Sequence, residues 1–306
     1  LSGTIEYFGR KSGDMLYNKP VAGSNGYTFI PMNVGSLKNS GLEIDLKWNI
    51  INNKDIRWDM YANATMVRNK IIELHPDLEG KLVSGTTIYE EGYSMYRMNL
   101  VEYAGVNPDT GVAEYYATDD DGLRYRTEEY TTAQNHRIQT DDMLPRVYGG
   151  FGTSIEAYGF DASVQMSYQL GGEIYDSGYA RLMHGGTSGS AGNNWHNDIH
   201  KSWTPENTNT DVPRVNANDK YANNTSTRFL TSSDYLSFNN VTIGYTIPKS
   251  LLRKIQFESL RIYFAADNIG LIASRKGLDP RQSFTSATTA RYTPIRTISG
   301  GFSITF

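Results

Sequence analysis

Two histidines four residues apart are the first candidates for chemistry in this chain. His196 and His200 would share one face of a helix, as the zinc ligands of metalloproteases do, but that chemistry also needs a glutamate after the first histidine. The chain has Asn197 there, and Trp195 and Trp203 lie two helical turns apart around the pair. We therefore interpret the segment as a short amphipathic loop helix that packs its tryptophan face, with a metal site as the alternative.

Two further segments have the composition of ligand loops but lack essential residues. The run 119–122 (Asp-Asp-Asp-Gly) has neither the alternating oxygen ligands nor the final glutamate of a calcium loop, so we interpret it as a solvated acidic turn, with calcium binding as the alternative. The glycine-rich run 185–192 has no lysine and no strand-to-helix context, which argues against a phosphate site and favours a flexible extracellular loop tip. No nucleophile–base set can be assigned from spacing. We predict no catalytic residue, metal site or cofactor, and hence no enzyme.

Composition excludes several other classes of protein. The net charge of -4 over 306 residues argues against a nucleic-acid-binding protein, which needs a basic face. The absence of cysteine excludes disulfides and thiolate metal sites. The mean hydropathy of -0.50 suits a water-soluble chain on average, but a membrane barrel gives the same average because its apolar residues occupy alternate positions. No run approaches the roughly 18 apolar residues of a membrane-spanning helix.

Period-two alternation of apolar and polar residues is the clearest structural signal. In segment 160–170, Phe160, Val164 and Leu170 belong to the apolar set and Asp161 and Gln165 to the polar set, so one face of a strand is apolar. The same reasoning predicts eight strands, near 3–17, 35–51, 56–70, 146–157, 160–171, 233–247, 259–269 and 294–306. Several of them reach the roughly 9–11 residues that a tilted strand needs to cross a bilayer.

The connections between these strands alternate in length. The gaps 52–55, 158–159 and 248–258 are short, whereas 18–34, 71–145, 172–232 and 270–293 are long. Outer-membrane barrels have short periplasmic turns and long extracellular loops. The sequence therefore predicts an all-β fold, a transmembrane antiparallel β-barrel.

Aromatic residues lie beside the short turns, on the apolar face. Trp48 and Trp58 flank the first turn, Phe160 follows the second, Tyr245 precedes the third, and Phe306 is the last residue. We expect them to form a lipid-facing girdle at the membrane interface, with an aromatic core layer of a soluble sandwich as the alternative. The opposite face carries the charges expected of a hydrated lumen, namely Glu43, Asp45, Lys47, Arg57, Asp59, Asp161, Arg261 and Asp267.

Short motifs along the whole chain resemble those of one transporter family. They are residues 13–17, the Asn33, Gly35, Asn39, Gly41, Leu42 and Glu43 pattern, residues 103–111, 203–207, Pro213 and Arg214, residues 235–248, 260–263, 267–268 and 277–280, and the terminal phenylalanine. In this order they resemble the C-terminal barrel portion of SusC/RagA-type TonB-dependent transporters of the Bacteroidetes. One departure is Ser237-Phe-Asn239, where the family commonly has Arg-Leu-Lys, so we expect different lumen chemistry there.

The resemblance implies a barrel of about 22 strands closed around a plug. Residues 1–306 would then form about the last eight strands, with the plug, the TonB-contacting region and the signal peptide upstream of this chain. It further implies a protein of the bacterial outer membrane, surrounded by lipid, that imports oligosaccharides or peptides with a SusD-like surface lipoprotein as a lid. The alternative is a soluble carbohydrate-binding β-protein. Because loops commonly carry binding function, we predict ligand and lid contacts from loops 172–232 and 270–293, with Trp195, Trp203 and Tyr179 as candidate ligand contacts. For Trp203 the alternative, a residue of the loop core, is favoured over direct ligand contact.

The last strand also suggests an assembly signal. Phe302, Ile304 and Phe306 alternate outward, and the resemblance implies that Phe306 is the true C-terminus and that the insertion machinery reads it. In the full-length protein, Phe306→Leu keeps most of the apolar area, so a girdle role alone, about 1.5–3 kcal/mol of burial, predicts normal insertion. A signal role predicts slow insertion and periplasmic precursors, both for Phe306→Leu and for one polar residue added after Phe306. Pulse-labelling with protease protection measures this, and normal kinetics for both variants would remove the signal role.

Overall fold

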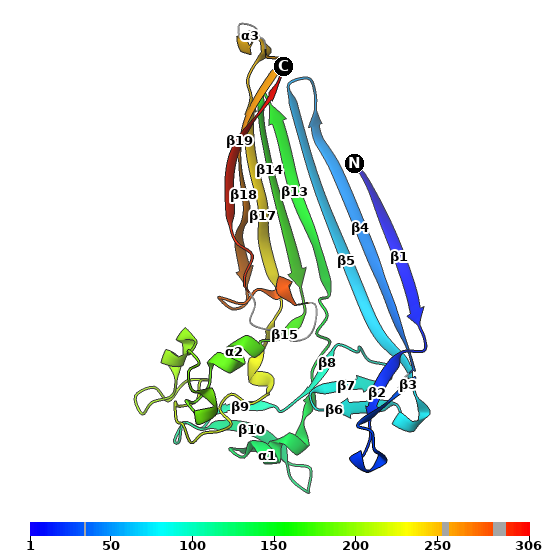
Figure 1. The fold of residues 1–306 in the computed structure, drawn as a ribbon, viewed down its shortest axis with the longest axis vertical. Helices are drawn as coiled ribbons and strands as arrows, with labels where there is room; N and C mark the ends of the chain where they lie inside the picture. The colour runs from blue at the N-terminus through cyan, green and yellow to red at the C-terminus, as the bar shows by residue number, and fades with distance from the viewer. Residues whose placement is uncertain (34, 253–256, 284–291) are drawn as a thin grey trace.

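Eight long strands form one antiparallel sheet. The structure is a computed structural model that describes residues 1–306 except 34, 253–256 and 284–291. Within the described residues each long strand pairs with the long strands that precede and follow it in the sequence, in the order β1-β4-β5-β13-β14-β17-β18-β19 (Figure 1). Their bounds are β1 (Ser2–Ser12), β4 (Gly35–Asn52), β5 (Ile56–Leu74), β13 (Val147–Ala157), β14 (Phe160–Leu170), β17 (Tyr235–Thr246), β18 (Ser259–Ala273) and β19 (Thr297–Thr305). This arrangement confirms the eight predicted strands.

The first predicted strand, 3–17, ends earlier than expected. Strand β1 stops at Ser12, and β2 (Leu16–Pro20) begins a separate hairpin with β3 (Phe29–Asn33) inside the predicted loop 18–34. Asp14 causes the break, because its φ is 56° and its carboxylate accepts a 2.7 Å hydrogen bond from the Asn33 side chain across the hairpin. Residue 34 of this loop, residues 253–256 of the third short turn and residues 284–291 of the last loop lie outside the described residues.

The register gives the sheet one continuous apolar face. Val164 lies opposite Thr153 of β13 and Val241 of β17, and the same alignment continues across the sheet. Nine large apolar side chains on this face are between 51% and 73% exposed: Ile5, Tyr7, Trp48, Phe160, Ile243, Ile262, Phe264, Ile298 and Phe302. A face of this kind is too large and too apolar for an ordinary water-exposed surface.

The opposite face is polar, as the sequence predicts. Near the short turns, Arg261 of β18 reaches across β17 to Asp161 of β14 and forms a two-pronged ion pair, with nitrogen–oxygen distances of 2.8 and 2.5 Å. The side chains pass over Gly244, where a Cβ would lie only 2.5 Å from an Asp161 carboxylate oxygen and 2.6 Å from an Arg261 nitrogen. Glycine at this position therefore makes room for a charge pair that ties three strands together.

Aromatic residues predicted for the girdle lie near the short turns. The rings of Phe160 and Tyr245 are 4.5 Å apart, and the Trp58 indole donates a 2.8 Å hydrogen bond to Thr153. Trp48 is 54% exposed and Phe306 81% exposed, and the Phe306 ring contacts that of Phe257 at 5.2 Å. Their apolar surfaces point away from the polar face.

The buried core lies in the long loops rather than in the sheet. Figure 1 shows loops 71–145 and 172–232 folded into a separate layer at one end of the sheet. One cluster contains Met98, Leu100, Met143, Tyr175 and Phe229, and a second contains Val101, Tyr115 and Tyr130. No helix in the described ranges is long and apolar enough to span a membrane.

Small strands, helices and 3-10 turns build this loop layer. The strands are β6 (Lys81–Ser84), β7 (Thr87–Glu90), β8 (Arg97–Leu100), β9 (Tyr103–Val106), β10 (Ala113–Thr118), β11 (Arg124–Thr127), β12 (Ile138–Gln139), β15 (Glu173–Tyr175) and β16 (Leu230–Ser232). The helices of the layer are α1 (Tyr130–Ala133) and α2 (Ser177–Leu182). A third helix, α3 (Lys249–Leu252), lies at the opposite end of the sheet and is not part of the layer. The 3-10 turns used below are η4 (Ser188–Ser190), η5 (Asn197–Lys201) and η8 (Pro280–Gln282).

The two faces of β14 predict opposite responses to a new charge. In the full-length protein, Val164→Arg places a guanidinium on the apolar face, where near the middle of a bilayer it costs about 2–4 kcal/mol. We expect this variant to fail to assemble in the membrane, whereas Gln165→Arg, one residue away on the polar face, should assemble normally. Heat-modifiability of the barrel on gels measures assembly, and equal behaviour of the two variants would contradict the register.

Candidate functional site

Motif residues from two long loops hold the loop layer together. The Trp203 indole donates a 2.9 Å hydrogen bond to the carbonyl of Pro108, and its ring lies against Gly111, whose φ of 74° suits glycine. Arg214 donates a 2.9 Å hydrogen bond to the carbonyl of Thr110 and forms an ion pair with Asp219 at 2.7 Å. The bonds to Pro108 and Thr110 join residues about a hundred positions apart, so the motifs at 103–111, 203–207 and 213–214 have a structural role here.

The segment around the two histidines is not the amphipathic helix expected from the sequence. It forms the 3-10 turn η5, and His196 precedes this turn as its N-cap, where its Nδ1 accepts a 3.1 Å hydrogen bond from the Asp198 amide. The expectation was wrong because the turn begins after His196 and ends before Trp203, whose backbone amide instead donates a 2.9 Å hydrogen bond to the Val212 carbonyl. Trp195 stacks on His184 at 5.1 Å and is 48% exposed.

The two other motif-like segments adopt ordinary loop structure. The Asp119 carboxylate accepts hydrogen bonds from the backbone amides of Asp121 and Leu123, at 3.1 and 2.7 Å, and so forms the turn between β10 and β11. The glycine-rich run 185–192 contains the 3-10 turn η4. Among the described residues, no three His, Asp or Glu side chains are grouped so as to hold a metal ion.

Arg275 fastens the last loop to the loop layer. Its guanidinium lies 3.6 Å above the Tyr179 ring and forms a 3.0 Å ion pair with Asp176, which also caps helix α2. The Tyr179 hydroxyl donates a 3.1 Å hydrogen bond to Asp198. Burial, followed by the charge of Asp198, raises the pKa of Tyr179 to about 12, so this phenol stays protonated at neutral pH. Tyr179 is thus fixed between the two loops.

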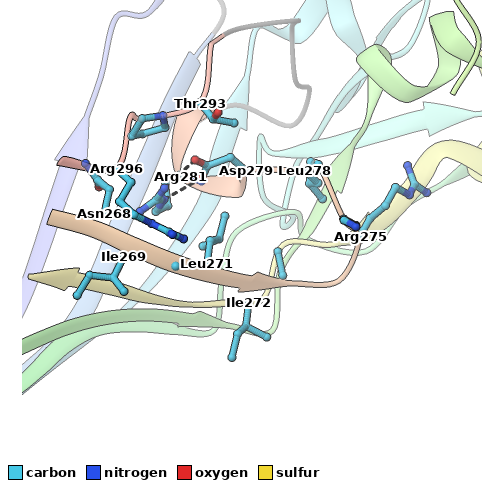
Figure 2. Close-up of a pocket in the computed structure, with 15 residues that line it drawn as sticks. Asn268, Ile269, Leu271, Ile272, Arg275, Leu278, Asp279, Arg281, Thr293 and Arg296 are labelled. Carbon is cyan, nitrogen blue, oxygen red and sulfur yellow. Dashed lines mark hydrogen bonds and ion pairs between the residues drawn. The ribbon is translucent and has the colours of Figure 1, made fainter. Parts of the chain in front are cut away.

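Arg281 fastens the same segment to the sheet. It forms two 2.8 Å hydrogen bonds with the Asp279 carboxylate (Figure 2). It forms a third, of 2.6 Å, with the buried Ser237 hydroxyl. The Ser237 hydroxyl in turn donates to the side-chain oxygen of Asn239. Residues 237–239 are the segment that departs from the family's motif. Ser237 of this segment therefore accepts a hydrogen bond from the guanidinium of Arg281 in the neighbouring loop.

Three cavities surround the segment from Arg275 to Gln282. The cavity drawn in Figure 2, of about 600 Å³, lies along the end of β18 and is lined by four cationic side chains, Arg275, Lys276, Arg281 and Arg296. A second, of about 320 Å³, is lined by residues that include Tyr179 and His196. The third, of about 450 Å³, lies between the loop layer and the polar face of the sheet.

The third cavity combines aromatic walls with a carboxylate. Three tyrosines, Tyr96, Tyr148 and Tyr235, line it together with Glu173 and Arg281. Burial, followed by the negative charge of Asp141, raises the pKa of Glu173 above its ordinary value. This combination can bind a polar ligand with one charged end, and we take the cavity as the candidate functional site.

Sequence reasoning placed only part of this region. Tyr179 lines the second cavity, whereas Trp195 and Trp203 line none of the three, and their ligand contacts stay predictions. The residues of the third cavity were missed, because they come from many separate segments, among them the loop before β8, the strands β13, β15 and β17, and the last loop. No spacing in the sequence connects them. The one available signal was the alternation in β13, which places Tyr148 on the polar face.

Comparisons with known proteins support the resemblance inferred from the motifs. No family model matches the chain. TonB-dependent receptor P3 of Formosa agariphila is 26% identical over 332 residues, covering 99% of this chain and 32% of the relative. TonB-dependent receptor SusC of Bacteroides thetaiotaomicron is 24% identical over 291 residues, covering 92% of this chain and 28% of that protein.

Solved structures agree with this result. A structure of the RagAB peptide transporter superposes with a TM-score of 0.82 at 26% identity, covering 99% of this chain and 33% of that chain. The RagAB peptide importer in its open-open state gives 0.82 at 25% identity, covering 99% of this chain and 32% of that one. The chain thus spans about a third of the length of the relatives it matches. The resemblance to the C-terminal barrel portion of SusC/RagA-type transporters and the predicted β-barrel fold are confirmed.

The two tryptophans predict different effects on the loop layer. In the full-length protein, Trp203→Ala removes an indole that contacts Gly111 and bonds to Pro108, so we expect the free energy of local unfolding to fall by about 2 kcal/mol. The exposed Trp195→Ala should change it by less than about 1 kcal/mol. Hydrogen exchange of residues 103–116 measures this difference, and equal protection in both variants would contradict the structural role of Trp203.

Proposed function

We propose that this chain is the C-terminal part of the wall of an outer-membrane barrel that imports oligosaccharides or peptides with energy supplied through TonB. The exposed apolar face of the eight-stranded sheet carries the proposal. Ile243, Phe264 and Phe302 lie on adjacent strands of that face, each more than half exposed. Lipid is the surrounding in which such a face is stable.

The polar face and the loop layer fit the remaining parts of this function. The Asp161–Arg261 pair lies on the lumen side, where water screens charges and a large solute can pass. The loop layer then lies outside the cell and the short turns face the periplasm. In this arrangement Trp48, Trp58, Phe160, Tyr245 and Phe306 form the lower girdle, and Phe302, Ile304 and Phe306 present the assembly signal outward.

The partners follow from the resemblance to SusC and RagAB. A SusD-like lipoprotein would cover the loop layer, where loops 172–232 and 270–293 meet, and the TonB complex would act through a region that is not part of residues 1–306. The RagAB structures concern a peptide transporter, which makes peptides one substrate class and oligosaccharides the other. A soluble carbohydrate-binding protein is disfavoured by the exposed apolar face.

Energy-coupled import makes a direct prediction. Cells that produce the full-length protein and its lid lipoprotein should take up a fluorescent peptide or oligosaccharide mixture, and a protonophore or loss of TonB should reduce uptake at least tenfold. The matched control is the full-length Gln165→Arg variant, which should import normally. Extraction of the full-length protein from cells without detergent, or uptake that persists without the proton gradient, would contradict the proposed function.

A further inference from the structure

The aromatic cavity beneath the loop layer has rigid walls. Tyr148 of β13 and Tyr235 of β17 lie on the polar face, on either side of Gln169 of β14. Tyr96 and Met143 come from the loop above the sheet. Glu173 lies in β15, which is held by pairing with β16 and by the hydrogen bond from the Glu173 amide to the Met143 carbonyl. A ligand entering the cavity would therefore meet prearranged groups, which reduces the entropic cost of binding.

Glu173 is an unusual member of this lining. In the described part of the chain, its half-buried carboxylate forms no ion pair and no side-chain hydrogen bond. Among the described residues, the charge that acts on it appreciably is the like charge of Asp141. A half-buried carboxylate without a partner loses hydration without gaining a compensating contact, so a cation placed beside it would stabilise the site.

The cation that lines the same cavity is already engaged. Arg281 directs its guanidinium to Asp279 through two hydrogen bonds and to Ser237 through a third. Asp279 is buried, and its two oxygens hold the Arg281 fork in a fixed orientation. Arg281 is therefore paired with Asp279 rather than with Glu173, and among the described residues no other cation pairs with the Glu173 carboxylate.

We propose that this cavity binds a ligand through its ammonium group, with Glu173 as the counter-ion and the tyrosine rings as the walls. The inference rests on the proposed import function and assigns a substrate class to it. Tyrosine faces attract cations as well as apolar carbons, so the rings favour an alkylammonium over a carboxylate or phosphate. A neutral sugar would leave the Glu173 charge unpaired. Free peptide N-termini and amino sugars both carry the required group.

Calorimetric titration of the purified full-length protein in detergent tests the proposal. The probes are trialanine amide and glucosamine, each with its N-acetylated form as the control. At least one free amine should bind saturably, and its acetylated form should bind at least about tenfold more weakly because acetylation removes the charge. The probe that binds identifies the source of the ammonium group. Equal binding of the free and acetylated forms, or no saturable binding of either amine, would overturn the proposal.

Matched variants assign the effect to the cavity. Glu173→Gln keeps the shape of the side chain and should weaken amine binding at least about tenfold. Glu156→Gln, which removes an exposed carboxylate at the short-turn end of β13, should leave binding unchanged. Tyr148→Phe should keep most of the affinity and Tyr148→Leu should reduce it, because only the second removes the ring. If Glu173→Gln assembles with normal heat-modifiability and still binds the amine like the parent, Glu173 is not the counter-ion.

The outcome is separable from that of the proposed function. Energy-dependent uptake of neutral oligosaccharides alone, unaffected by Glu173→Gln, would refute ammonium recognition and leave import intact. Amine binding in detergent without energy-dependent uptake in cells would support ammonium recognition and refute the proposed import function.

Discussion

The continuous antiparallel register of the eight-stranded sheet is the constraint on which the other features depend. Because side chains alternate across a sheet, a slip of one residue in any pair would exchange the apolar and polar faces of that strand. The register shift around Asn239 of β17 shows how this constraint is used. Val241 and Ile243 point to the apolar face, and beyond the shift Leu236 and Phe238 do so. The same shift turns Ser237 toward Arg281 and Tyr235 toward the aromatic cavity, so one extra residue builds part of the candidate site.

Stability of the loop layer comes from a different source. The sheet buries little apolar surface of its own, whereas the loops contain Leu100, Tyr115 and Phe229, which are fully buried. Long connections are usually mobile, and a hydrophobic core is what makes these ones a platform. The contact between Trp203 and Gly111 explains why those residue types occur there: the glycine provides both the left-handed backbone and the space that the indole ring fills. Aromatic motif residues such as Trp203 thus stabilise the loop layer.

The sequence predicted what depends on local pattern and missed what depends on distant contacts. The eight strands and the polar placement of Asp161 and Arg261 follow from alternation alone, which needs only neighbouring residues. The helix expected at Trp195–Trp203 was wrong because Trp203 is bonded to Val212 and to the distant Pro108, contacts that spacing does not reveal. The break at Asp14 depends on a partner 19 residues away. The residues of the aromatic cavity come from many separate segments, from β4 to the last loop, and their convergence is fixed by the register shift at Asn239 and by the packed loops.

The ion pairs of the segment from Arg275 to Gln282 connect the sheet, the loop layer and the aromatic cavity. Arg275 is paired with Asp176 and stacked on Tyr179, and Arg281 is paired with Asp279, so two of the cations of the segment act as fasteners. Without Asp279, the Arg281 guanidinium would have Glu173 as an alternative partner across the cavity, and an internal ion pair would compete with any cationic ligand. The bidentate Asp279 clamp removes that competition, because a planar fork held by two carboxylate oxygens and a serine hydroxyl has a single preferred orientation. The same clamp that attaches the loop to the sheet thereby leaves Glu173 without Arg281 as an ion-pair partner.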